Sequence, residues 1–201
     1  MKCKCEWCDK EQEHMGYCNR HYQQVKRWGE CRHTRRDPHH FIIDGKIAYM
    51  PIYYENGELK ETVIIDTEDI ERIKKHKWNQ QNNGKHIEGY VNGKVIQLHR
   101  FIMNEDKDGI IIDHINRNPL DNRKCNLRRC NSQQNCCNRK THNKNKLKVK
   151  NVRQRKDGKY EVNICKNYKQ IYIGVYDSLE EAIVERDKAL KKLHGEFASF
   201  G

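Results

Sequence analysis

Long apolar runs are missing from this 201-residue sequence. No stretch approaches the roughly 20 consecutive apolar residues that a membrane helix needs, and no apolar region of a secretory signal peptide follows residues 1–5. We therefore expect a soluble, intracellular, cytoplasmic protein with no membrane partner. Only 35% of the residues are hydrophobic while 34% are charged, so we expect several small cores instead of one large core.

Acidic residues are also in short supply. The 28 Asp and Glu residues stand against 40 Lys and Arg, which gives a formal net charge of +12 and a pI of about 9.2. Such a surplus favours a polyanionic partner, because contacts with phosphates would then provide most of the affinity. The alternative is a basic surface that is merely solvated.

Cysteine, in contrast, is plentiful, and ten cysteines in a reducing compartment favour metal ligands or buried thiols over disulfides. Within residues 1–36, Cys5-x2-Cys8 and Cys18-x2-His21 form two close pairs that fit tetrahedral zinc. So short a segment would take its folding energy from the metal. Cys3 could replace Cys5, and free cysteines on a flexible tail are the alternative. Because four ligands fill the coordination sphere, we expect a structural zinc knuckle.

Residues 41–94 predict a β-rich scaffold. Short runs of β-branched and aromatic residues are punctuated by Asn56-Gly57 and Asn92-Gly93, and each pair is typical of a hairpin turn. Thr67, followed by three acidic residues in the next four positions, predicts the start of a short helix. We expect no catalytic residue in this region.

The pattern most indicative of chemistry lies between residues 110 and 138. An apolar run ends in Asp113-His114, and a polar loop follows. After the loop come Asn126-Leu127-Arg128, as the returning strand, and then a capped helix that carries Asn135. This order predicts a ββα-metal finger. Asp113 and Asn135 would offer oxygen ligands to magnesium or a similar ion. His114 would act as the general base, and the Asn126 amide would hold the loop.

Each spacing alone is weak evidence, because asparagine is common in this chain and an isolated Asp-His pair is not diagnostic. The strength of the pattern lies in the whole arrangement. The remaining cysteines of the region, Cys125, Cys130, Cys136 and Cys137, lack paired spacing. We interpret them as small packing residues, with a second zinc site as the alternative.

Residues 139–150 hold six basic residues and no acidic one, which predicts a basic linker centred on residues 141–146. A twelve-residue extended segment spans at most about 40 Å, which is close to one turn of duplex DNA, about 34 Å. The linker could therefore place two modules on neighbouring DNA segments. A passive spacer is an equally good interpretation.

Residues 147–201 predict three strands followed by a helix. Val162 and Ile164 alternate with polar residues, and Ser178 opens a helix with an apolar stripe. If this stripe covers one face of the sheet, the other face is basic and aromatic, which suits the major groove of DNA. A solvated face is the alternative. The residues expected on that face or at its rim are Arg153, Arg155, Lys159, Lys169 and Tyr172.

Residues 95–140 contain the segments Leu98-His99-Arg100-Phe101, Asp113-His114-Ile115-Asn116, Asn122, Asn126-Leu127-Arg128 and Gln134-Asn135. With these segments they resemble the HNH endonucleases, specifically the phage and intron-encoded branch. The resemblance implies that Asp113 and Asn135 hold the metal and that His114 activates water. An Asn stands at position 135 where the family name expects His, as in the intron-encoded nicking enzymes, and this favours Mg²⁺ or Mn²⁺ over zinc. The resemblance also implies that His99 assists the reaction or contacts a phosphate.

Residues 147–200 contain the segments Asn151-Val152-Arg153-Gln154-Arg155, Gly158-Lys159-Tyr160, Tyr172-Ile173-Gly174-Val175-Tyr176 and Ser178-Leu179-Glu180-Glu181-Ala182. With these segments they resemble the APETALA/ethylene-response-factor (ERF) type of DNA-binding domain, which is also found fused to phage HNH enzymes. The N-terminal Cys/His segment resembles the zinc knuckles seen ahead of such enzymes. The resemblance implies that Tyr160 and Tyr172 take the places of groove-facing tryptophans. Cys165 and Gln170 replace two family arginines, so the base specificity should differ.

Taken together, the sequence predicts an α+β chain of small domains: a zinc knuckle (1–36), a scaffold (41–94), an HNH finger (95–140), a linker (141–146) and an ERF-like domain (147–201). We expect a homing or nicking endonuclease for double-stranded DNA, phage-encoded in a bacterial host. A single finger favours a monomer. The alternatives are a non-catalytic, sequence-specific DNA-binding regulator and an RNA-binding protein.

Overall fold

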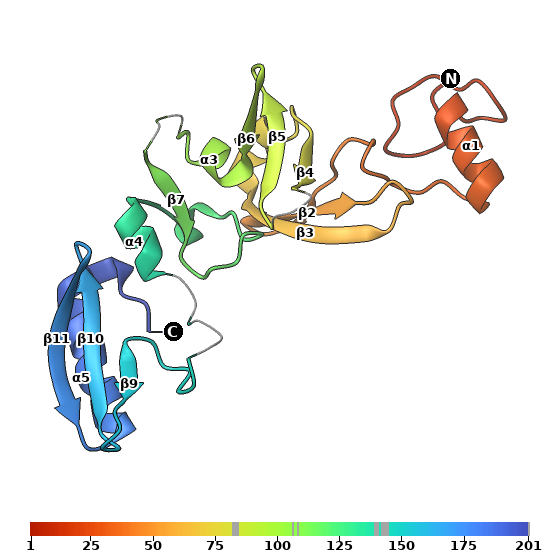
Figure 1. The fold of residues 1–201 in the computed structure, drawn as a ribbon. Helices are drawn as coiled ribbons and strands as arrows, with labels where there is room; N and C mark the ends of the chain where they lie inside the picture. The colour runs from red at the N-terminus through yellow and green to blue at the C-terminus, as the bar shows by residue number, and fades with distance from the viewer. Residues whose placement is uncertain (82–84, 106, 108, 139–140, 142–144, 201) are drawn as a thin grey trace. The chain divides into compact units, whose positions relative to one another are not determined.

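The computed structural model of the chain describes residues 1–81, 85–105, 107, 109–138, 141 and 145–200, and the chain divides into two compact units (Figure 1). The first unit comprises Met1–Asp106 and Asn118–Leu127, and the second comprises Lys107–Arg117 and Arg128–Gly201. Small sheets and helices occur in both, which confirms the expected mixture of α and β structure. Among the described residues, none of the helices combines the length and apolar composition that a membrane span requires.

The first unit begins with a Cys/His-rich segment and the helix α1 (Asn19–Trp28). Two isolated antiparallel bridges, Lys2↔Glu11 and His14↔Tyr17, fold the segment before the helix back on itself. The helix ends at Gly29, which adopts a left-handed conformation (φ 78°) and donates its N–H to the carbonyl oxygen of Val25. The apolar core of this segment consists mainly of cysteine side chains.

Two three-stranded antiparallel sheets follow, with strand orders β1-β2-β3 and β4-β5-β6. The hairpins expected at Asn56-Gly57 and Asn92-Gly93 are confirmed, and both Asn92 (φ 48°) and Gly93 (φ 82°) take the positive φ angles of a tight turn. Their elements are β1 (Ile42–Asp44), β2 (Ile47–Tyr53), β3 (Leu59–Asp66), η1 (Thr67–Asp69), α2 (Ile70–Ile73), β4 (Trp78–Gln80), β5 (Ile87–Val91), β6 (Lys94–Gln97) and α3 (Leu98–Ile102).

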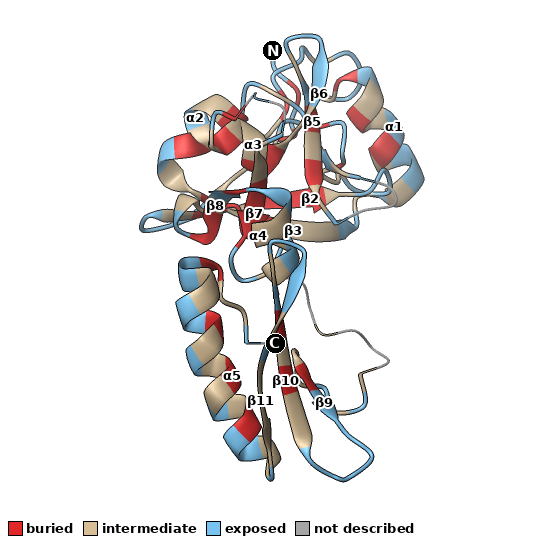
Figure 2. Ribbon diagram, turned by 60° about the vertical axis from the view of Figure 1, so that its left-hand side comes forward, coloured by how far each residue is buried: buried red, intermediate tan, exposed pale blue. Residues whose placement is uncertain are grey.

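Buried apolar residues of these sheets and helices form the core of the first unit. Buried positions are red on the ribbon in Figure 2. Trp78 is fully buried, and its indole N–H donates to the carbonyl oxygen of Ile73 at 2.9 Å. Residues 118–127, which include the 3-10 helix η2 (Lys124–Asn126), attach to the edge of β3: the N–H of Ile64 donates to Leu120 O, and that of Asn122 donates to Ile64 O, each at 2.8 Å.

In the second unit, the strands β7 (Ile111–His114) and β8 (Leu127–Cys130) form a two-stranded sheet, and the helix α4 (Ser132–Cys137) follows. Leu127, the first residue of β8, is assigned to the first unit. The cap of α4 is Asn131, whose side chain accepts from the N–H of Gln134 at 2.9 Å while the Gln134 side chain accepts from the N–H of Asn131. This reciprocal pair satisfies N–H groups that the first turn of a helix leaves unbonded. The predicted order of strand, loop, strand and helix is therefore present.

The sheet β9 (Val152–Gln154), β10 (Tyr160–Lys166) and β11 (Lys169–Tyr176) packs against α5 (Leu179–His194), which the short η3 (Gly195–Phe197) follows. Ser178 caps α5 by accepting from the N–H of Glu181 at 3.1 Å. The shared core consists of Val152, Val162, Ile164, Ala182 and Leu190, with Leu147 and Val149 packed against it. Of the predicted linker 141–146, residues 142–144 lie outside the described residues.

A histidine beside Trp78 makes the stability of the first unit depend on pH. The ring nitrogen Nε2 of His39 accepts from the backbone N–H of Trp78 at 2.9 Å. Burial, together with the charge of Lys77 and the nearby His33 and His40, lowers the pKa of His39 from 6.5 to about 4. The folded protein therefore keeps His39 neutral at pH values where the unfolded chain binds a proton.

We expect the free energy of unfolding to fall as the pH drops from 6.5 towards 4, by up to about 3 kcal/mol from this group. The sign follows because the unfolded state binds more protons in this window. Chemical denaturation at several pH values, monitored by tryptophan fluorescence, measures the slope. His39→Gln should flatten it, and an unchanged slope in this variant would assign the dependence to other groups.

Candidate functional site

Four buried side chains of the N-terminal segment converge on one point. The Sγ atoms of Cys3, Cys8 and Cys18 and the imidazole of His21 all lie within 4.8 Å of one another. Cys3 Sγ is 3.3 Å and Cys18 Sγ 3.5 Å from His21 Nδ1, and the Cys8 and Cys18 sulfurs are 3.9 Å apart. These separations match the edges of a tetrahedron about a zinc ion with bonds of about 2.0–2.3 Å. The cluster could therefore hold a metal ion.

Polar groups around His21 orient it for that task. Its second ring nitrogen, Nε2, lies 2.8 Å from Arg20 Nη2 and 3.3 Å from Oδ1 of the buried Asp37. The other carboxylate oxygen of Asp37, Oδ2, accepts from the backbone N–H (2.9 Å) and hydroxyl (2.8 Å) of Thr34. Although burial opposes its ionisation, hydrogen bonds from Arg20 and Thr34 hold the pKa of Asp37 below its ordinary value. Burial also lowers the pKa of His21. A neutral imidazole backed by a carboxylate is a typical metal ligand.

The structure places Cys3 in this cluster, and not Cys5, which was the first choice from the sequence. Cys5 is joined to Cys31 by a disulfide, so its thiol is committed elsewhere. This pair also corrects the expectation that the cysteines form no disulfide. The Cys5-x2-Cys8 spacing favours Cys5, whereas the structure brings Cys3 to the cluster, and the local chain turn that selects between the two is not visible in a spacing.

Asp113 lies at the end of β7, where it is 8% exposed and held by two side chains. Arg128 on β8 donates to Oδ2 from Nε (3.1 Å) and Nη2 (2.9 Å). Asn138, directly after α4, places Nδ2 3.1 Å from Oδ1 and 3.0 Å from Oδ2. The carboxylate is thus fixed by charge-assisted hydrogen bonds in a buried position.

His114 is 6% exposed beside Asp113. Its carbonyl oxygen accepts from Asn138 Nδ2 at 2.8 Å and from the N–H of Arg117 at 2.9 Å. Asn138 therefore links the end of α4 to both residues of the Asp-His pair. Sequence reasoning assigned no role to Asn138, although it stands three residues after Asn135 and hence on the same helical face.

The other predicted site residues divide between the two units. Asn135 lies in α4 and is half-buried, and its side chain makes no hydrogen bond within the described part of the chain. Asn126 and His99 belong to the first unit. The Asn126 amide donates to Asp121 O at 2.8 Å. His99, on α3, is 5% exposed, with its ring centroid 5.3 Å from that of His86.

The outer face of the sheet β9-β10-β11 carries charged and aromatic side chains. Tyr172 is 62% exposed, and Arg153 pairs with Glu161 at 3.1 Å. At the rim, Arg155 pairs with Asp157 and Lys159 with Asp177, and Lys169 is exposed. Tyr160 departs from the expectation: it packs against the core beneath α5, because it shares strand parity with Val162 and Ile164.

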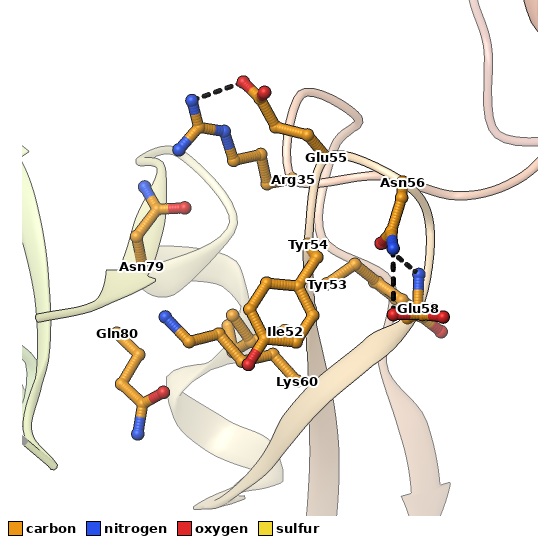
Figure 3. Close-up of a pocket in the computed structure, with 10 residues that line it drawn as sticks. All are labelled: Arg35, Ile52, Tyr53, Tyr54, Glu55, Asn56, Glu58, Lys60, Asn79 and Gln80. Carbon is orange, nitrogen blue, oxygen red and sulfur yellow. Dashed lines mark hydrogen bonds and ion pairs between the residues drawn. The ribbon is translucent and has the colours of Figure 1, made fainter. Parts of the chain in front are cut away.

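A pocket of about 610 Å³ in the first unit contains none of the predicted site residues (Figure 3). Arg35 forms an ion pair with Glu55 across its rim, and the Asn56 amide donates to Glu58 at 2.8 Å. The Lys60 ammonium lies 5.4 Å from the centroid of the Tyr54 ring. Because these charged and polar groups are engaged with one another, we do not place the active site here.

Comparison with known proteins identifies the family. The chain is 31% identical over 164 residues to an uncharacterised HNH endonuclease of Acanthamoeba polyphaga mimivirus, and the alignment covers 79% of this chain and 83% of that protein. The chain therefore belongs to the HNH endonuclease family. No protein-family model and no solved structure matches it, and the ERF-like resemblance of residues 147–200 receives no support from these comparisons.

Proposed function

We propose that this chain is a metal-dependent endonuclease of the homing or nicking type, which hydrolyses a phosphodiester of double-stranded DNA. One observation carries the proposal: the buried, doubly held Asp113 adjoins His114 at the end of β7 in a member of the HNH endonuclease family. The net charge of +12 supports a polyanionic substrate. The cytoplasmic location and the phage origin stay predictions.

The donor set at Asp113 fits a hard cation. Among the described residues, Oδ1 of Asp113 accepts only from Asn138, whereas Oδ2 accepts from Arg128 as well, so Oδ1 keeps lone-pair capacity for an ion. With the amide oxygen of Asn135, this carboxylate would hold Mg²⁺ or Mn²⁺. When bound, such an ion stabilises negative charge on the phosphate and on the leaving oxygen.

His114 is proposed to be the general base that takes a proton from the attacking water. Its backbone is fixed at the carbonyl by Asn138 and by the N–H of Arg117, which limits the positions that the imidazole can take. Asn126 is proposed to hold the loop through its bond to Asp121. His99 is proposed to assist the reaction or to contact a phosphate.

The outer face of the sheet β9-β10-β11 is proposed to bind the duplex. Arg153 and Arg155 would contact phosphates or guanine edges, and Tyr172 offers an exposed aromatic ring. Lys159 and Lys169 would extend the positive charge at the rim. Tyr160 is left out of this surface because of its packing against the core. Since each chain carries one Asp113-His114 pair, we propose a monomer that nicks one strand.

The N-terminal cluster is proposed to hold a structural zinc ion on Cys3, Cys8, Cys18 and His21. Three soft thiolate ligands and one imidazole favour zinc over magnesium. All four coordination positions would be filled by protein atoms, so no position remains for a substrate. The zinc would stabilise a segment whose apolar core is small.

The proposal is tested by nicking of supercoiled plasmid DNA with Mg²⁺. We expect cleavage by the wild type, none in excess EDTA, and a loss of about 100-fold or more in Asp113→Ala, because this variant removes the charged oxygen ligand. Glu180→Ala, which removes an exposed carboxylate of the same unit at the start of α5, is the matched control and should cleave normally. Salt-sensitive DNA binding without metal-dependent cleavage would instead favour a non-catalytic DNA-binding regulator.

A further inference from the structure

Arg128 contacts two parts of the second unit that are far apart in the sequence. Its Nε and Nη2 atoms donate to Oδ2 of Asp113, and its Nη1 donates to the carbonyl oxygen of Glu196 at 2.6 Å. The guanidinium carbon lies 4.4 Å from the centroid of the Phe197 ring. Glu196 and Phe197 belong to η3, directly after α5. The Arg128 side chain is only 11% exposed.

This arrangement uses both properties of a guanidinium group. The planar fork of N–H groups fixes the direction of the Asp113 carboxylate, and the flat face packs on the aromatic ring of Phe197. Because Phe197 is itself 8% exposed, the ring offers a rigid surface. Arg128 contacts Oδ2 and leaves Oδ1 to Asn138, so it orients the carboxylate without covering the oxygen that we assign to the cation.

We propose that Arg128 is the positioning residue for Asp113, and that η3 holds Arg128 in place through Phe197 and Glu196 O. Through Arg128, the segment η3 thereby sets the affinity of Asp113 for the divalent cation. This inference rests on the proposed function, because it takes Asp113 as the cation ligand. Groups that orient a ligating carboxylate commonly change metal affinity about 10- to 100-fold when they are removed.

The binding of Mn²⁺ to the intact chain without DNA, followed by the electron paramagnetic resonance signal of free Mn²⁺, tests the proposal. We expect Arg128→Gln to raise the Kd for Mn²⁺ about 10- to 100-fold. Arg128→Lys should retain part of the affinity because it keeps the charge without the fork. Phe197→Ala should raise the Kd about 3- to 10-fold, since it removes the stacking partner and leaves the fork. The thiol-rich N-terminal cluster favours softer ions than Mn²⁺.

Phe200→Ala is the matched control. The Phe200 ring also contacts a cation, Lys191 Nζ, at 5.9 Å near the C-terminal end of the second unit, but it does not touch Arg128. We expect this variant to bind Mn²⁺ as the wild type does. A double variant separates positioning from general destabilisation: adding Phe197→Ala to Arg128→Gln should cause no further loss, because Phe197 acts through Arg128.

Three outcomes would overturn the inference. They are wild-type affinity for Mn²⁺ in a folded Arg128→Gln variant, tighter binding in that variant (which would make Arg128 a competitor of the cation), and full additivity in the double variant. Asp113→Ala distinguishes this failure from failure of the proposed function. If Asp113→Ala still binds Mn²⁺, the cation site itself is misassigned. If only this variant loses binding, the cation site stands and the role of Arg128 does not.

Discussion

Replacing His114 by alanine is expected to slow plasmid nicking about 100- to 10,000-fold at saturating Mg²⁺, the range that a general base contributes. The residue adjoins the ligand Asp113, and its carbonyl oxygen is bonded to Asn138 and to the N–H of Arg117. Removing the imidazole leaves these backbone bonds in place. The loss should therefore fall on the chemical step, and the binding of DNA and of Mn²⁺ should change little.

Single-turnover cleavage with DNA binding measured in parallel checks this expectation. His114→Gln, which keeps most of the side-chain volume in a buried position, should be as inactive as His114→Ala. An exposed histidine provides the control: His14→Ala removes an imidazole from the N-terminal segment and should cleave like the wild type. Equal cleavage by wild type and His114→Ala would remove His114 from the mechanism and leave the base to another group.

The part of this site that the sequence could predict is the part that is contiguous along the chain. Asp113 and His114 are neighbours after an apolar run, so a strand end places them together without knowledge of the fold. The contacts of Arg128 and Asn138 with Asp113 bridge 15 and 25 residues. They depend on how β8 and α4 return to β7, which no local pattern encodes. The three-residue step from Asn135 to Asn138 was the one available signal.

The same division holds for the fold. Hairpins at Asn56-Gly57 and Asn92-Gly93 and the cap at Ser178 follow from local backbone preferences and were predictable. The attachment of residues 118–127 to β3 through Ile64 was not, because it joins segments over fifty residues apart. Tyr160 is a different case. Its alternation with Val162 and Ile164 indicates the inner face of the sheet, whereas the family resemblance implies the groove-facing side, and the structure agrees with the alternation.

Replacing Cys3 by serine is expected to abolish stable zinc binding, whereas replacing Cys5 by serine should leave it intact. The cluster positions Cys3 Sγ 3.3 Å from His21 Nδ1, while Cys5 is bonded to Cys31. Structural zinc contributes on the order of 10 kcal/mol to the folding of small zinc domains. Loss of one of four ligands should therefore unfold the N-terminal segment. Loss of the disulfide costs about 2–4 kcal/mol and spares the metal.

Zinc content after dialysis against a weak chelator, with limited proteolysis of the N-terminal segment, separates the two variants. We expect close to one zinc ion per chain in the wild type and in Cys5→Ser, and little zinc and rapid N-terminal cleavage in Cys3→Ser. Cys125→Ser, an exposed cysteine outside the cluster, controls for the substitution itself. If Cys5→Ser lost the zinc and Cys3→Ser kept it, the paired Cys5-x2-Cys8 spacing would define the ligands, and Cys3 would be a packing residue. Because α1 carries His21 and begins directly after Cys18, zinc loss should also reduce helical content.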